Sequence, residues 1–162
     1  MIHDGFTLAD SEAIAEYLND AFRDVPMLPE DMQLRAKARE FSRHHDTRLE
    51  PSVRAMYPQV AHETRNADAV VAGGAEVSKH LASLALLLES NPLDTSRLWL
   101  CDCGFVVTFA WIKAFEIDLG LPVSWPDTVR AYDARLQGFS AVAEELTAYR
   151  PAMEGYLQKA RP

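Results

Sequence analysis

The hydrophobic positions of this chain recur mostly at the three- and four-residue spacing that is typical of amphipathic helices. The longest such pattern begins near Glu30 and continues to about Pro58. Its apolar stripe consists of Leu34, Ala38, Phe41, His45, Leu49, Val53 and Met56. Pro51 lies inside this pattern and lacks the backbone donor that a regular helix uses, so we expect one helix with a kink near residues 49–51.

Proline and glycine divide the rest of the chain into further helical segments. A looser stretch is expected up to Gly73-Gly74, before an apolar helix over 76–90. Three shorter helices, each bordered by proline or glycine, are expected to complete the chain over 126–137, 139–148 and 151–160.

The most apolar segment is 98–112, where Asp102 is the only charged residue. This segment is shorter than the roughly 20 residues that a helix needs to cross a bilayer. We therefore expect a central helix surrounded by other helices, with Gly120 as a left-handed cap beyond its end. The Asp102 carboxylate is expected to cap this helix by accepting backbone amides rather than to act in acid–base chemistry.

Only residues 1–7 have the character of a strand, and no partner strand is expected for them in this chain. Asp10 is placed to cap a following helix that runs to about Leu18. Pro26 and Pro29 then mark a linker. The pattern predicts a mostly α-helical fold.

Composition and charge narrow the possible functions. The chain has 162 residues, 48% of them hydrophobic, which fits one globular domain. Its net charge of −8 and the lack of a basic run argue against nucleic acid and anionic membranes as partners. Residues 1–5 do not read as an export signal, which predicts a cytoplasmic protein. Cys101 and Cys103 diverge around a helix and have no further cysteines to join them, so no metal site is expected.

Asp10 and Ser11 form the first candidate site. The start of a helix presents unpaired amide hydrogens and a partial positive charge, so a ligand carboxylate could dock against the amide and hydroxyl of Ser11. The alternative is an ordinary helix cap made by Asp10.

A second candidate group lies on the long helix and the buried helix. Imidazoles and a guanidinium could hold an anionic or polar electrophile in a pocket walled by aromatic rings. The residues of this candidate pocket are Phe41, His44, His45, Arg48 and Trp111. The alternative is that a histidine on an apolar stripe is a satisfied core residue, and the aromatic residues are core as well.

Several segments resemble the cytosolic glutathione transferase superfamily, in the same order along the chain. Residues 4–18, with Asp10-Ser11, are similar to the end of the thioredoxin-like half of that family. The linker ending at residues 27–29, the opening 34–39 of the long helix, and Asp102 are similar to its helical half. So are the segments 132–136 and 139–142.

This resemblance implies a remnant of the thioredoxin-like, glutathione-binding domain at residues 1–22, a linker at 23–29, and an all-α C-terminal domain at 30–162. The fold it implies is a glutathione transferase C-terminal-like helical bundle with a residual strand–helix piece of an incomplete thioredoxin-like domain. It also implies that Asp10 and Ser11 bind the γ-glutamyl carboxylate of glutathione as co-substrate, and that the protein forms a homodimer.

Two departures from the family pattern affect the expected function. The family usually has serine or threonine three residues before the buried aspartate, but this chain has Trp99, so we expect Ser96 or Thr95 to cap the helix instead. The hydroxyl or thiol that activates glutathione in the family is missing from this chain. If the chain is a fragment or a late start, the whole protein is expected to be an enzyme that transfers the glutathione thiol to an electrophilic small molecule.

Two other interpretations remain open. The first is a non-catalytic helical module that binds a protein partner through faces that the missing half would cover. The second is a small-molecule carrier with an apolar crevice between the long helix and the buried helix.

Overall fold

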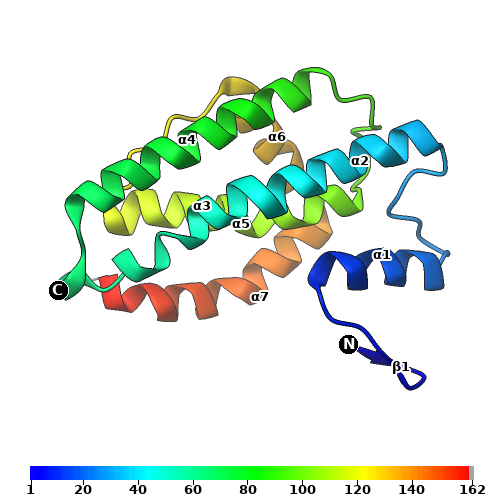
Figure 1. Cartoon of the computed structure of the whole chain (residues 1–162), viewed down its shortest axis with the longest axis horizontal. Helices are drawn as coiled ribbons and strands as arrows, with labels where there is room; N and C mark the ends of the chain where they lie inside the picture. Colours follow the sequence, from blue (N-terminus) through cyan, green and yellow to red (C-terminus); the bar gives the residue numbers. More distant parts are fainter. Residues whose placement is uncertain (161–162) are drawn as a thin grey trace.

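The computed structural model describes residues 1–160 and shows an elongated bundle of helices with a small hairpin at the N-terminus (Figure 1). The mostly α-helical fold that the sequence predicts is confirmed. The main helices are α1 (Ser11–Ala21), α2 (Met32–His44), α3 (Glu50–Arg54), α4 (Ala67–Glu89), α5 (Leu100–Leu119), α6 (Asp127–Gln137) and α7 (Ser140–Leu157).

The N-terminal segment forms its own small sheet. Strands β1 (Ile2–His3) and β2 (Phe6–Thr7) pair antiparallel, with Ile2 opposite Thr7. The expectation that this strand has no partner is therefore wrong. Asp4 and Gly5 have positive φ angles of 48° and 82°, which is the backbone twist that a two-residue hairpin turn requires.

Helix α1 lies beside the bundle rather than within it (Figure 1). Arg39 of α2 donates two hydrogen bonds, of 2.8 and 2.7 Å, to the carboxylate of Glu16. The Asn19 side chain accepts from the backbone N–H groups of Met27 and Leu28, which holds the linker against the end of α1. Polar contacts therefore contribute to the placement of α1.

The predicted kink in the long helix is present as a π-helical turn. This turn, His45–Leu49, joins α2 to α3 immediately before Pro51. The N–H of Glu50 donates to the carbonyl of His45, five residues earlier. A wider turn at this place accommodates a proline that cannot continue the ordinary ladder of hydrogen bonds. Two short 3₁₀ turns, Tyr57–Gln59 and His62–Thr64, follow α3.

Helix α4 begins well before the predicted start and passes directly through Gly73-Gly74, so the expected loose stretch is wrong. Both glycines lie where other parts of the chain approach α4 closely. A Cβ atom at Gly73 would be 2.2 Å from the Met56 sulfur, and one at Gly74 would be 2.5 Å from the Pro122 carbonyl oxygen. The glycines therefore allow close packing and do not end the helix.

By length and composition alone, α4 is the one helix among residues 1–160 that could span a membrane. Its inner side chains Val77, Leu81 and Leu84 are fully buried in the protein core. This is the environment of a core helix in a packed bundle.

Helix α5 forms the centre of the molecule, as predicted, and extends past the predicted end to Leu119. Its side chains Phe105, Phe109, Ile112 and Phe115 are fully buried. Gly120 has a φ of 69° and forms the expected left-handed cap.

The C-terminal segment is one helix, α7, and not the two that the sequence predicts. Pro151 lies inside it. On the two sides of Pro151, Tyr149 accepts a hydrogen bond from Trp111 of α5, and the ring of Tyr156 packs against Trp111. Tertiary contacts before and after the proline thus hold α7 together despite the lost hydrogen bond. A 3₁₀ turn, Gln158–Ala160, follows.

Candidate functional site

The start of α1 presents unpaired donors to solvent. One oxygen of the Asp10 carboxylate accepts from the N–H groups of Glu12 and Ala13, each at 3.1 Å. Asp10 has a φ of 80°, a conformation that is uncommon outside glycine and turns the chain sharply into the helix. Ser11 is exposed, and among residues 1–160 neither its N–H nor its hydroxyl has a hydrogen-bond partner. The predicted cap by Asp10 is confirmed, and it leaves the Ser11 donors free.

A cleft of about 370 Å³ separates the start of α1 from the long helix. Its lining combines hydroxyl, carboxylate and guanidinium groups, from Asp10, Ser11, Arg43, His45, Asp46, Thr47, Glu50 and Arg54. The Arg54 guanidinium is paired with Glu50. The Arg43 guanidinium has no ion pair or hydrogen bond within the described chain, so it is available to an anion in this cleft.

His45 forms the floor of this cleft and is held from both sides. Its Nδ1 lies 2.7 Å from a carboxylate oxygen of Asp46, and its Nε2 lies 2.8 Å from the hydroxyl of Thr108 on α5. The imidazole is 8% exposed and packs edge-on against Phe105. His45 is thus a packed histidine, and its contact with Asp46 holds that carboxylate at the cleft.

His44 and Arg48 lie on the side of the long helix that faces α4, where they line a different cleft. The His44 Nε2 lies 3.1 Å from the backbone oxygen of His80. Burial lowers the pKa of the His44 imidazole, and the hydrogen bond to His80 partly opposes that shift.

Phe41 and Trp111 belong to the hydrophobic core, with 2% and 6% of their surfaces exposed. The Trp111 indole N–H donates to the hydroxyl of Tyr149. The structure therefore does not bring the five residues of the expected substrate pocket together: His45 faces one cleft, His44 and Arg48 face another, and the two aromatic residues lie in the core.

Asp102 has the predicted capping role. One carboxylate oxygen accepts from the N–H of Trp99 at 2.9 Å, and the other accepts from the Tyr132 hydroxyl at 2.6 Å and from Arg135 at 2.9 Å. Burial and then the nearby Asp102 charge raise the pKa of Tyr132 well above its usual value. The expectation that Ser96 or Thr95 caps α5 is wrong, because Asp102 itself reaches back to the helix start.

The two cysteines are free thiols. Cys101 is buried and Cys103 is exposed. Burial raises the pKa of the Cys101 thiol, which favours its protonated form over the nucleophilic thiolate. Within residues 1–160, no three His, Cys, Asp or Glu side chains gather in a way that could hold a metal ion.

The chain was compared with protein families, with curated sequences and with solved structures. No family model matches the chain. It is 29% identical over 115 residues to glutathione S-transferase U7 of Arabidopsis thaliana, a match that covers 71% of this chain and 46% of that protein. The maleylpyruvate isomerase of Pseudomonas aeruginosa PAO1 superposes with a TM-score of 0.70 at 20% identity, over 89% of this chain and 77% of that one. The chain has a glutathione transferase-like fold. It spans about half the length of the curated plant relative.

The sequence did not single out Arg43 and Asp46 as residues of the cleft beside Ser11. Arg43 belongs to no apolar stripe and to no motif, so the sequence carries no signal for it. Asp46 is the direct neighbour of His45, but its orientation depends on Thr108, which is 63 residues away along the chain.

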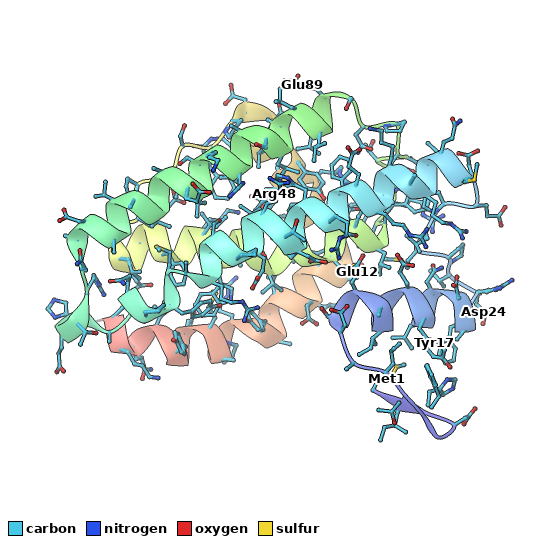
Figure 2. The ribbon with its side chains drawn as sticks, in the orientation of Figure 1. Met1, Glu12, Tyr17, Asp24, Arg48 and Glu89 are labelled. Atoms are coloured by element: carbon cyan, nitrogen blue, oxygen red, sulfur yellow. The ribbon has the colours of Figure 1, made fainter. Side chains whose placement is uncertain are left out.

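Glu12 points toward the long helix (Figure 2) and gives the fold a pH dependence. Burial raises the pKa of the Glu12 carboxyl above 4.5, and a hydrogen bond with Ser42 partly opposes the shift. Since the folded state then binds the proton more tightly than the unfolded state, stability falls as the pH rises from 4.5 through the raised pKa.

We expect Glu12→Gln, which cannot ionise, to have a higher urea midpoint than the parent at pH 7 and a similar one at pH 4. Urea denaturation at a series of pH values measures this difference. Glu144→Gln, at an exposed position, serves as the control and should follow the parent at every pH. A Glu12→Gln effect of the same size at pH 4 and pH 7 would contradict the burial argument.

Proposed function

We propose that this chain binds glutathione at the start of α1 and helps transfer its thiol to an electrophilic small molecule held in the adjoining cleft. The observation that carries the proposal is the free N–H and hydroxyl of Ser11 at the mouth of a cleft that also contains an unpaired guanidinium, Arg43. The likeness to glutathione S-transferase U7 supports glutathione as the ligand.

The α-carboxylate of the γ-glutamyl group fits this place chemically. A helix N-terminus stabilises a negative charge through its partial positive charge, and its first N–H groups donate directly to the anion. Asp10 orients the helix start through its bonds to Glu12 and Ala13, and Ser11 supplies the donors. Arg43 adds a permanent positive charge from the opposite wall.

The electrophile is proposed to enter between Ser11 and the His45–Asp46 pair. His44, Arg48, Phe41 and Trp111 take no part in this version of the site, because they face another cleft or the core. We assign thiolate formation to no residue of this chain. Conjugation therefore requires a hydroxyl or thiol from outside this chain that hydrogen-bonds to the glutathione sulfur.

The sharpest test replaces Ser11 by proline. Ser11 is the first residue of α1, and proline is tolerated at that position because its missing N–H has no partner in the helix. Ser11→Pro thus removes both proposed donors and keeps the helix. We expect the glutathione affinity of Ser11→Pro, measured by isothermal titration calorimetry, to be lower than that of the parent by at least about tenfold. The affinity of Ser11→Ala should decrease less, because this variant keeps the backbone N–H.

Met32→Pro is the matched control, because Met32 is the exposed first residue of α2 behind a similar aspartate cap. It should bind glutathione as the parent does. Equal binding by Ser11→Pro and the parent, or no binding by the parent, would refute the proposed carboxylate site.

A second candidate function is a non-catalytic interaction module. It is supported by a mostly apolar cleft of about 440 Å³ formed by α1, the linker and the start of α5. This cleft is lined by Ala15, Leu18, Asn19, Phe22, Asp24, Val25, Met27 and Leu100. Retention of the chain on glutathione resin favours the transferase, whereas no retention favours the module.

We also propose that the protein forms a homodimer and is located in the cytoplasm. Sedimentation of the purified chain measures the oligomeric state, and a single species of monomer mass would contradict the dimer.

A further inference from the structure

A second cleft, of about 470 Å³, lies between the long helix and α4. Its lining includes Glu40, Arg43, Arg48, Lys79, Leu86 and Leu87. The lining contains three permanently charged cations and a single carboxylate, although the chain as a whole carries a net charge of −8. The proposed glutathione site uses Arg43 but accounts for neither Arg48 nor Lys79.

Two of these cations are free to bind a ligand. Glu40 is occupied by Lys37, and Lys79 forms an ion pair with Glu76. The guanidinium groups of Arg43 and Arg48 have no ion pair or hydrogen bond to any part of the chain that the structure describes.

The π turn at His45–Leu49 brings these two arginines to the same cleft. Residues five positions apart point in different directions on a regular α-helix, but a π turn contains more residues and brings them closer to one face. Figure 2 shows Arg48 on the side of the long helix that faces α4. Turns of this kind are rare and occur frequently at functional sites.

The opposite wall of the cleft is suited to an organic ligand. Lys79 provides a third cation on α4, and the 66% exposed Leu86 and the half-buried Leu87 provide an apolar surface further along the same helix. Ser83 and Thr47 already donate their hydroxyl hydrogens to backbone carbonyls of their own helical segments, so these hydrogens are not available to an anion.

We propose that this cleft binds a phosphate monoester with a small apolar body. Two guanidinium groups can each donate a pair of hydrogen bonds to phosphate oxygens, and the Lys79 ammonium adds a point charge. The apolar body of the ligand lies over Leu86 and Leu87. This cleft differs from the one proposed for glutathione, although Arg43 and Thr47 line both.

The test titrates the full chain with phenyl phosphate, with inorganic phosphate and with benzyl alcohol, followed by calorimetry and by two-dimensional NMR of the backbone amides. We expect saturable binding of phenyl phosphate that is tighter than that of inorganic phosphate, and no saturable binding of benzyl alcohol. Binding should weaken as salt is added, because the contacts are ionic.

Arg48→Gln and Lys79→Gln test the site without changing the cleft beside Ser11. Loss of a charged hydrogen-bonding group should weaken phenyl phosphate binding by about tenfold or more for Arg48→Gln. Arg130→Gln is the matched control, because Arg130 is exposed on α6 and lines none of the clefts described above. Its affinity should equal that of the parent.

Three results would overturn the inference: no saturable binding by the parent, unchanged binding by Arg48→Gln, or an equal loss in Arg130→Gln. Glutathione affinity of Arg48→Gln is measured in parallel and should not change, so this inference and the proposed function can fail independently.

Discussion

Replacing Asp102 by alanine is expected to lower the free energy of unfolding by about 3–5 kcal/mol, because it leaves the partly buried Arg135 guanidinium without its carboxylate partner. Asp102 is 4% exposed and accepts from Trp99, Tyr132 and Arg135. In Asp102→Ala the N–H of Trp99 and the hydroxyl of Tyr132 lose their acceptor as well. Urea denaturation followed by circular dichroism measures the change.

Asp24→Ala is the control for this experiment, since Asp24 is exposed and makes no ion pair or hydrogen bond in residues 1–160. Its stability should stay within about 0.5 kcal/mol of the parent. Tyr132→Phe removes only one of the three donors and should cost about 1 kcal/mol. A loss below 1 kcal/mol in Asp102→Ala would show that the carboxylate does not hold α5 and α6 together.

Gly74→Ala is expected to have the second largest effect, a net loss of about 2 kcal/mol. Its Cβ would lie 2.5 Å from the backbone oxygen and 2.7 Å from the ring of Pro122, so either α4 or the loop after α5 must move. Overpacking of this kind costs up to about 3 kcal/mol, and the better helix propensity of alanine returns about 1 kcal/mol. Thermal or urea denaturation measures the net change.

Gly155→Ala supplies the matched comparison, because Gly155 also lies inside a helix but has no atom within 4 Å of a built Cβ. It should gain about 0.5–1 kcal/mol from helix propensity alone. Gly73→Ala should fall between the two, since its Cβ meets the flexible Met56 side chain. If Gly74→Ala were as stable as Gly155→Ala, close packing would not explain the glycine at position 74.

The helices were largely predictable because their signals are local. The apolar stripe of the long helix, the cap at Asp10 and the left-handed Gly120 each depend on neighbouring residues, and all are present in the structure. The errors arose where distant contacts override a local signal. Gly73-Gly74 and Pro151 are ordinarily helix breakers, yet α4 and α7 continue through them because other segments pack against these places.

The residues of the candidate site also differ in how far the sequence alone could predict them. Asp10 and Ser11 could be singled out from the sequence, since a helix start has the same donors wherever it lies in a fold. The five expected pocket residues could not be placed together from spacing. The π turn changes the directions of His45 and Arg48, and Phe41 and Trp111 are buried where helices pack against one another.

By itself, the sequence of this protein determined the helical class, most helix positions and the Asp10 cap at the start of α1, because hydrophobic periodicity and capping act over a few residues. Only the tertiary structure decided that Arg43 and Asp46 face Ser11 across a cleft, and that Arg48 lies near Lys79. Those pairings join residues far apart in the chain, and they depend on how whole helices pack.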